Sequence, residues 1–322
     1  MSFAGSDTLA TAYTLSLALK RLKPDLILCG RQTIDGDTGQ VGPELSVFLE
    51  QKFVGNVMEL KAENMLVCRT RDGENIETEY PVVCSVEKNW KLRLPSIRSK
   101  QGEVIIWNAK DLQADLEKCG FSGSPTKVLK TFENEQDRRK CKFITKEELP
   151  KVIEMSVQQA KKQLAKAEPS TDRLSKVWIV GKAPKEMAMT ISDDITEIEL
   201  DLPKNMAEKI NEGRPNAVLW GSDTESKITA AKVAAMLKLG LCADCTALET
   251  DGNELYMYRP AFSGNIIAKI RSVTTPQMAT VRTAHERAAS IVVGVGMGAK
   301  DMLEQAEGVN IFACFLAKTA YF

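Results

Sequence analysis

Histidine is nearly absent from this sequence, which contains only His285 among its 322 residues. Zinc sites built on histidine, and nucleophiles activated by a Ser–His or Cys–His pair, would all have to use that single side chain. The scarcity disfavours the usual zinc enzymes and hydrolases. We interpret His285 as a loop residue without a catalytic role.

A surplus of charge and long apolar runs are also lacking. Lysine and arginine together number 43, as do aspartate and glutamate, so the formal net charge is zero. Nothing in this balance attracts the chain to nucleic acid or to an anionic membrane surface. No run of 18 apolar residues occurs, and residues 1–7 lack the pattern of a signal peptide. We expect a cytoplasmic protein whose partners are proteins or small molecules, without nucleic-acid partners or membrane insertion.

Cysteine is too sparse for a disulfide scaffold, with eight residues that are scattered except for Cys242 and Cys245. The Cys-x-x-Cys spacing of this pair occurs in redox dithiols and in half zinc sites. No second pair or nearby histidine completes a set of four zinc ligands. The pattern therefore favours structural thiols at the entry of a strand over a metal or redox site.

The length and the alternation of elements predict an α/β protein with two Rossmann-like units. At about 150 residues per domain, 322 residues correspond to about two domains. Apolar runs flanked by helical periodicity predict parallel sheets in both units, with a β-rich extension in the second. We expect units at residues 1–145 and 173–288, joined by a charged helical linker or arm at 146–172 and followed by a short segment at 289–322.

In the first unit, Ser6 and Asp7 offer a cap for a helix that ends before Pro24. Residues 25–30 read as a buried strand, a helix is expected to start at Pro43, and an Asp72-Gly73 turn indicates a hairpin. The other elements expected along the chain are strands at 81–86, 177–180, 195–202, 217–221 and 290–293 and helices at 204–212 and 225–239.

The loop at residues 30–42 contains four glycines, two aspartates and two threonines after the first strand. Glycines let backbone N–H groups approach a ligand closely, and short polar side chains donate hydrogen bonds to phosphate or ribose. The loop matches neither the Walker pattern nor Gly-x-Gly-x-x-Gly. Composition alone leaves open whether it binds a nucleotide or is an ordinary turn-rich connection.

Three further features carry weaker signals. The Gly-x-Gly-x-Gly at 294–298 follows a predicted strand, but its spacing differs from a dinucleotide-binding loop. Arg259 and Arg282 end or interrupt apolar stretches. Each is either a surface charge at a strand end or a guanidinium that faces an anionic or electron-rich ligand.

Taken together, these strings resemble the electron-transfer flavoproteins, and they do so twice. The first unit resembles the β subunit through residues 4–12, 26–43, 93–98 and 123–128. The second resembles the α subunit through residues 214–219, 233–235, 240–246, 259–265 and 276–282. The resemblance implies a β-to-α fusion in which the charged stretch is the joint.

The resemblance also implies cofactors, partners and site residues. The β-type loop of this family binds AMP or, in electron-bifurcating members, a second FAD, and the α-type half binds the main FAD. Arg259 matches the arginine facing the β-site flavin, Arg282 the one contacting the main FAD, and Leu94 the loop that docks onto partner dehydrogenases. The residues implied at the β-type site are Thr8, Thr11, Cys29, Gly30, Arg31, Thr33, Asp35, Gly36, Asp37, Thr38, Gln40 and Val41.

The sequence departs from the family at both ends of the resemblance. It starts at the helix that follows the first β-type strand, and residues 289–322 correspond only to the start of the FAD-binding domain. Both cofactor sites of the family are therefore incomplete on this chain, and we expect substoichiometric or no FAD in the purified protein. One hypothesis is an electron carrier, with no substrate chemistry of its own, that relays electrons from dehydrogenases or NADH through FAD. The other is a shortened paralogue without flavin that acts as a nucleotide-binding or protein-interaction module. For either hypothesis, a second chain that completes the fold would be a further partner beside a flavin-dependent dehydrogenase or another redox protein.

Overall fold

The computed structural model of the protein describes residues 2–88, 96–99, 102–133, 150–151, 154–155 and 172–282. Several predictions fall outside this part of the chain: most of the charged arm, the docking residue Leu94, the loop residue His285, and the predicted segment at 289–322. These stay predictions. Within the described residues, no helix is long and apolar enough to cross a bilayer.

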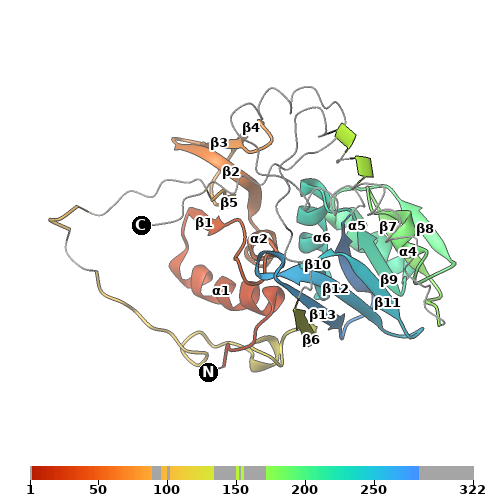
Figure 1. Ribbon diagram of the computed structural model, residues 1–322. Coiled ribbons are helices and arrows are strands. Elements are labelled where there is room, and N and C mark those ends of the chain that lie inside the picture. Colours follow the sequence, from red (N-terminus) through yellow and green to blue (C-terminus); the bar gives the residue numbers. More distant parts are fainter. Residues whose placement is uncertain are drawn as a thin grey trace.

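The first half of the chain forms a five-stranded sheet with the order β1-β5-β2-β3-β4 (Figure 1). Its first three strands are parallel neighbours, and the last two continue the sheet as an antiparallel hairpin. The predicted hairpin is thereby confirmed. The elements of this half are α1 (Thr8–Leu22), β1 (Leu26–Gly30), α2 (Val41–Leu49), β2 (Lys52–Ala62), β3 (Leu66–Thr70), β4 (Asn75–Thr78) and β5 (Val82–Val86).

Local signals explain the first helix better than the second. The Asp7 side chain caps α1 by accepting a hydrogen bond from the Ala10 N–H at 3.1 Å, as expected from the sequence. Helix α2 begins at Val41, two residues before Pro43, where a proline is still tolerated because first-turn N–H groups have no helical partner. The two helices pack on each other and bury Leu45 against the sheet.

Strand β2 has no counterpart among the elements predicted from the sequence. The pairing of β2 with β5 shifts register between Val54 and Val57, and Asn56 between them has a positive φ of 54°. A bulge of this kind interrupts the alternation of inward and outward side chains by which strands are recognised in a sequence.

The second half of the chain builds a five-stranded parallel sheet with the order β10-β14-β9-β7-β8. The fold class predicted from the sequence is confirmed. Strand β8 ends at Ile198, earlier than the predicted end at Leu202, and Leu202 is instead the N-cap residue of the next helix. The elements are β7 (Val177–Val180), α4 (Lys185–Ala188), β8 (Ile195–Ile198), α5 (Pro203–Gly213), β9 (Ala217–Trp220), α6 (Thr224–Leu237), β10 (Leu241–Cys245) and β14 (Gln277–Val281).

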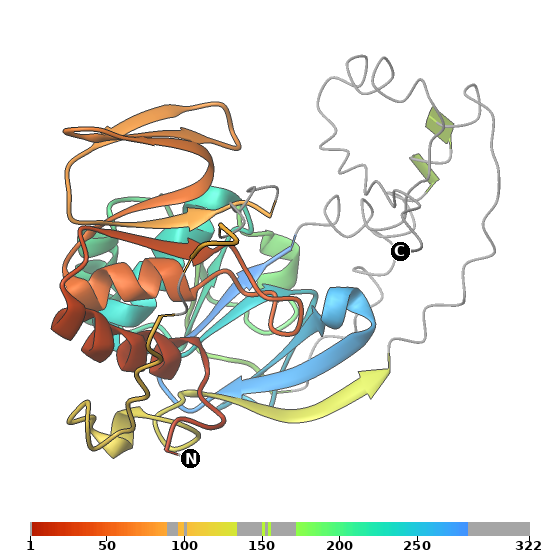
Figure 2. The ribbon, with the colours of Figure 1, turned by 90° about the vertical axis from the view of Figure 1, so that its left-hand side faces the viewer.

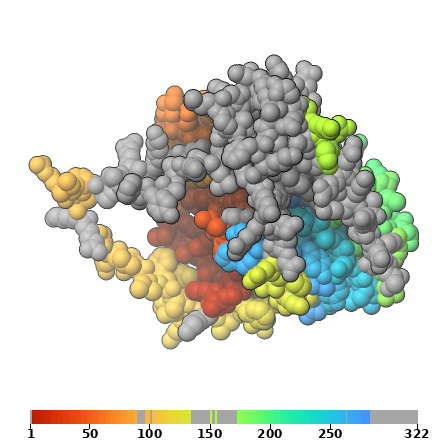
Figure 3. All heavy atoms as spheres, viewed as in Figure 1, coloured from red at the N-terminus to blue at the C-terminus, as the bar shows by residue number. Residues whose placement is uncertain are grey.

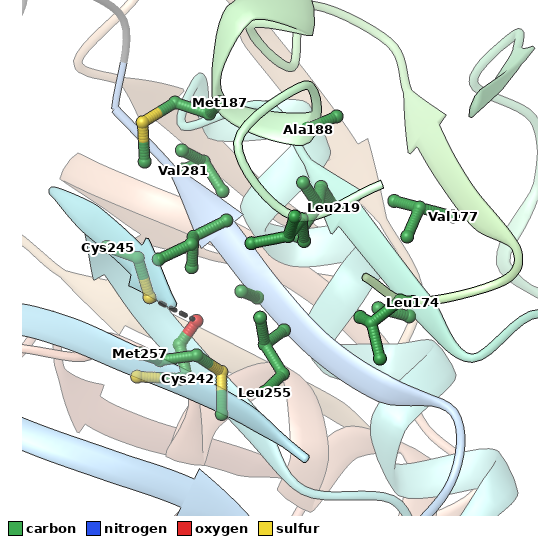
Figure 4. Close-up of a cluster of buried hydrophobic side chains, with 14 of the residues drawn as sticks. Leu174, Val177, Met187, Ala188, Leu219, Cys242, Cys245, Leu255, Met257 and Val281 are labelled. Atoms are coloured by element: carbon green, nitrogen blue, oxygen red, sulfur yellow. Dashed lines mark hydrogen bonds between the residues drawn. The ribbon is translucent and has the colours of Figure 1, made fainter. Parts of the chain in front are cut away.

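This parallel sheet is covered on both faces. On one face, α5 and α6 bury Met206, Ile210 and the small residues of α6 against Trp220. On the other face lies the cluster of Figure 4, which contains Leu219 of the sheet together with Leu255 and Met257. Because both faces are buried, β7 and β9 consist of apolar residues without alternation.

An antiparallel sheet with the order β11-β12-β13-β6 forms the outer layer on that second face. Its strands are β11 (Ala247–Thr250), β12 (Leu255–Ala261), β13 (Ile266–Ser272) and β6 (Thr126–Glu133). Strand β6 belongs in sequence to the first half, yet it pairs with β13 from the second half (Figure 2). The sheet therefore ties the two halves together.

The two halves also meet through helices. Helix α2 packs on α6, and the Lys232 ammonium lies 5.5 Å from the centre of the Phe53 ring. Arg71 donates a hydrogen bond to the Thr224 hydroxyl at 3.3 Å. The approach is closest at Gly55, where a Cβ atom would lie 2.8 Å from Cδ1 of Ile228. These contacts place the glycine-rich loop beside the strands of the second half.

Candidate functional site

A cavity of about 750 Å³ lies between the glycine-rich loop, the start of α1 and the strands β6, β10, β12 and β13. In Figure 3 the blue surface of the second half lies directly beside the red and orange surface of the first half. The cavity is therefore bounded by residues from both halves of the chain. Its volume lies within the range of about 300–1,000 Å³ that is usual for small-molecule sites.

The glycine-rich loop starts at the carboxyl end of β1, where ligands bind in open parallel sheets. The Asp37 N–H donates to the Thr33 carbonyl at 3.0 Å, and the Gln32 and Asp37 side chains are hydrogen-bonded to each other. The Thr33 hydroxyl and the Gly36 N–H lower the pKa of Asp35 below its usual value. The Phe262 N–H from the second half donates to the Asp35 carbonyl at 3.3 Å. The loop is thus folded on itself and held against the other half.

The structure brings most of the predicted site residues together. Asp37 and Arg282 are the two predicted site residues that do not line the cavity, apart from Leu94, which is outside the described part of the chain. The predicted residues on the cavity wall are Thr8, Thr11, Cys29, Gly30, Arg31, Thr33, Asp35, Gly36, Thr38, Gln40, Val41 and Arg259. Their common position agrees with a shared site, and their role in binding stays a prediction.

Arg259 is a buried cation on the cavity wall. It lies on β12 opposite Ala268 and is only 5% exposed. Its Nε atom has no hydrogen-bond partner among the described residues. Burial raises the pKa of Asp37, and the nearby Arg259 guanidinium partly offsets this rise. An anionic ligand group would give the unpaired N–H of Arg259 a partner.

Arg282 is engaged elsewhere. Its Nη2 lies 3.1 Å from Oδ2 of Asp244, and the Lys227 ammonium lies 2.6 Å from Oδ1 of the same carboxylate. Burial by itself would raise the pKa of Asp244, but these two cations hold it below the usual value. Arg282 is therefore paired with a carboxylate of its own chain, and its predicted contact with the main FAD remains untested.

The family model of the electron transfer flavoprotein domain matches residues 1–112 and 192–301. The chain belongs to the electron transfer flavoprotein family. It is 41% identical over 140 residues to the electron transfer flavoprotein subunit beta of Thermoanaerobacterium thermosaccharolyticum, covering 40% of this chain and 54% of the relative.

Two other relatives give similar matches. Protein FixA of Azorhizobium caulinodans is 36% identical over 148 residues, covering 40% of this chain and 53% of FixA. The caffeyl-CoA reductase-Etf complex subunit CarD of Acetobacterium woodii is 36% identical over 143 residues, covering 41% of this chain and 54% of CarD. The chain spans about half the length of the curated relatives it matches.

One buried acid of this electron transfer flavoprotein family member was not among the predicted site residues. Glu44 on α2 is 1% exposed, and burial raises its pKa well above the usual value. Oγ1 of Thr8 lies 2.9 Å from Glu44 Oε1 and 3.0 Å from Gln40 Oε1. Gln40 Nε2 in turn donates to the Leu241 carbonyl at 3.2 Å. A chain of hydrogen bonds thus runs from α2, past the cavity, to the first residue of β10.

The part of the cavity wall that the antiparallel sheet forms was also not predicted from the sequence. Side chains two residues apart on a strand point to the same face, so alternate positions of β13 line the cavity. Nothing in the local pattern of β6 indicated that it would lie beside β13, because strand partners far apart in sequence leave no local signal. The cavity-lining residues of this sheet are Thr126, Val128, Thr131, Arg259, Ala261, Ile266, Ala268 and Ile270.

Proposed function

We propose that this chain binds an adenine nucleotide, AMP or the adenine-nucleotide part of FAD, in the cavity and acts as an electron carrier. The observation that carries the proposal is the cavity itself, which joins the glycine-rich loop of one half to the buried Arg259 of the other. A relay from dehydrogenases or NADH, including the bifurcating type, follows from the family resemblance. This relay is a property proposed for full-length members of the family, of which the chain spans about half the length.

The residues present suit such a ligand. The backbone N–H of Gly30 and the hydroxyl of Thr38 can donate to phosphate or ribose oxygens, whereas the Gly36 N–H already donates to the Asp35 carboxylate. Arg31 also lines the cavity and lies 3.6 Å from Glu87, so its charge is shared with that carboxylate. Arg259 has an N–H that no described residue pairs with, and it lies in a low-dielectric surrounding in which a cation attracts negative charge strongly.

A bound flavin would supply the one-electron and two-electron chemistry. The protein's part is to hold the ligand and to stabilise charge that develops on it. Arg259 would stabilise negative charge on a ligand group beside it, and the apolar wall with Leu241 and Ala268 would keep water away from it. No bond to a substrate is made by a side chain in this proposal.

The domain division belongs to the proposal as well. We assign residues 1–145 to a β-type unit and 173–288 to an α-type unit, with 146–172 as the joint and 289–322 as the start of an FAD-binding segment. Leu94 would then lie in the docking loop for a flavin-dependent dehydrogenase or another redox partner. Pairing of β6 with β13 supports the close association of the two units that a fused β/α arrangement requires.

A second candidate function is a nucleotide-binding or interaction module without the main flavin. It is favoured by Arg282, the predicted contact of the main FAD, because this side chain is paired with Asp244. The two candidates share the cavity and differ in flavin content.

Calorimetric titration of the purified full chain with AMP and with FAD tests the shared part. Thr38→Ala should weaken binding by about twofold to tenfold, as expected for one lost hydrogen bond. Arg259→Gln should weaken it by more than about tenfold, because hydrogen bonds from charged groups contribute about 1.5–3 kcal/mol. Thr196→Ala, on the exposed surface of β8, is the matched control and should bind as the unmodified chain does.

Equal affinities for all four proteins would remove the cavity from the proposal. Flavin bound to the purified chain and reducible by NADH or a dehydrogenase would favour the electron carrier. AMP binding without any flavin would favour the second candidate.

A further inference from the structure

The Cys-x-x-Cys motif is not explained by nucleotide binding. Cys242 and Cys245 are both free thiols on β10, and both belong to the buried cluster between the parallel and antiparallel sheets. Figure 4 shows them within that cluster. In a regular strand, residues three apart point to opposite faces, so a shared cluster is unexpected for this spacing.

A bulge in β10 accounts for the shared face. Cys242 pairs with Ala279 and Cys245 with Val281, so three steps along β10 match two steps along β14. Asp244, within the bulge, has a positive φ of 58°. The extra residue turns the second thiol back to the side of the first. The Cys245 thiol donates a hydrogen bond to the Cys242 carbonyl at 3.8 Å.

The two thiols differ in access. Both residues are buried, at 3% and 0% exposed respectively, but Cys242 lines the cavity and Cys245 does not. A small molecule in the cavity would therefore meet Cys242 first. This is the arrangement of an attacking thiol and a resolving thiol.

The surroundings of the two thiols also favour Cys242 as the attacking thiol and Cys245 as the resolving thiol. A hydrogen bond with the Cys245 thiol lowers the pKa of Cys242, and so does the positive charge of the Arg259 guanidinium. Burial and the negative charge of Asp244 act in the opposite direction but do not cancel this decrease. Burial raises the pKa of Cys245 well above its usual value. By contrast, burial raises the pKa of Cys29, the other thiol on the cavity wall, and raises that of Cys84 to about 12. The thiolate, which is the reactive form, is thus favoured at Cys242.

We propose that Cys242 and Cys245 form a reversible dithiol–disulfide site that exchanges with small disulfides entering the cavity. Cys242 attacks one sulfur of the small disulfide RSSR, which forms a mixed disulfide and releases one thiol, RSH. Cys245 then loses its proton and attacks the Cys242 sulfur, which releases the second RSH. In total, two protein thiols are oxidised to one disulfide, and RSSR is reduced to two RSH.

The experiment uses the full chain, reduced with dithiothreitol, desalted, and mixed with hydroxyethyl disulfide. Products are followed by intact mass and by peptide mapping after the remaining thiols are alkylated. We expect a chain lighter by two hydrogens, with the new bond between Cys242 and Cys245. Cys242 should react about tenfold or more faster than Cys29 at neutral pH, and dithiothreitol should restore both thiols.

Single variants separate the two roles. Cys245→Ser should stop at the mixed disulfide on Cys242, and Cys242→Ser should leave Cys245 unreacted. Arg259→Gln should slow the reaction of Cys242 by about tenfold and shift its pH profile to higher pH, which a purely structural role of this arginine would not do. The far-UV circular dichroism of each variant is compared with that of the unmodified chain before it is used.

Three results would overturn the proposal. The first is an unmodified folded chain that forms no Cys242–Cys245 bond, although the same chain in urea does so readily. The second is a Cys242→Ser variant in which Cys245 reacts at the original rate. The third is a faster reaction at Cys29 than at Cys242. Because these measurements need no bound nucleotide or flavin, they succeed or fail independently of the proposed function.

Discussion

At the scale of single residues, the hydrogen bonds of Thr8 define the state of Glu44. The Thr8 hydroxyl has one hydrogen but two acceptor oxygens within 3.0 Å, on Glu44 and on Gln40. A protonated Glu44 can donate to Thr8, and Thr8 can then donate to Gln40. If Glu44 were ionised, the single hydroxyl hydrogen of Thr8 could serve only one of its two contacts, with Glu44 or with Gln40, and the other contact would have no hydrogen between its two oxygens. Its Oε2 atom also has no partner among the described residues, which makes a buried charge costly.

Replacement of Glu44 by Gln should therefore change how stability depends on pH. The pKa of Glu44 is raised in the folded state mainly by burial. Its contribution is fully present below the unfolded pKa of about 4.3 and is lost as pH rises toward the folded pKa. In that window the stability of Glu44→Gln relative to the unmodified chain should rise by up to about 1.4 kcal/mol per pH unit. Urea unfolding at several pH values measures this difference.

Glu44→Ala serves as the control for this experiment, because it removes the side chain and its hydrogen bond together. It should be less stable than Glu44→Gln throughout the same range. Parallel pH profiles for the unmodified chain and Glu44→Gln would show that folding does not raise the pKa of Glu44.

At the scale of elements, Asp7 joins a helix of one sheet layer to a strand of another. One carboxylate oxygen accepts from the Ala10 N–H and caps α1. The other accepts from the Thr126 N–H at 2.9 Å and from the Thr126 hydroxyl at 2.7 Å, at the first residue of β6. Asp223 caps α6 in a simpler way, since among the described residues its carboxylate accepts hydrogen bonds only from the N–H and the hydroxyl of Ser226.

Asp7→Ala should consequently destabilise the protein more than Asp223→Ala. Loss of a helix cap costs about 1 kcal/mol, and a half-buried N–H left without a partner at Thr126 adds about 1–3 kcal/mol. We expect about 2–4 kcal/mol for Asp7→Ala and about 1 kcal/mol for Asp223→Ala in urea unfolding. Equal losses would mean that the contact with β6 contributes nothing to stability.

At the scale of the whole molecule, the two halves share a sheet and a helix interface. Strand β6 extends the antiparallel sheet of the second half, and α2 packs on α6. Gly55 on β2 lies where a Cβ atom would be 2.8 Å from Ile228 on α6. Such continuous packing is expected to make the halves open and unfold together.

Hydrogen exchange followed by mass spectrometry tests this cooperativity. Peptides containing β5 of the first half and β9 of the second should exchange with the same free energy of opening. Gly55→Asp, which places a carboxylate in the interface, should make the two values diverge. Gly102→Asp is the control, since a Cβ there meets no atom of the described residues within 4 Å. Divergent values already in the unmodified chain would contradict a single cooperative unit.

Prediction from the sequence succeeded where the signal was local. The cap at Asp7 placed α1, the Asp72-Gly73 turn placed the hairpin, and the unbroken apolar run of β9 indicated a parallel strand buried on both faces. The bulge at Asn56 hid β2, because it breaks the period of two on which strand recognition depends. The partner of β6 was hidden for another reason, since its pairing spans more than a hundred residues.

The candidate site divides in the same way. The glycine-rich loop and Arg259 were predicted through residue types and family resemblance, but their common cavity, and the placement of Glu44 and the two thiols of β10 around it, came only from the structure. The sequence by itself determined the family, the α/β class and the loop, because these depend on residue type and short-range period. Only the tertiary structure decided which residues meet across the halves, because such contacts arise from strand pairing and packing between distant segments.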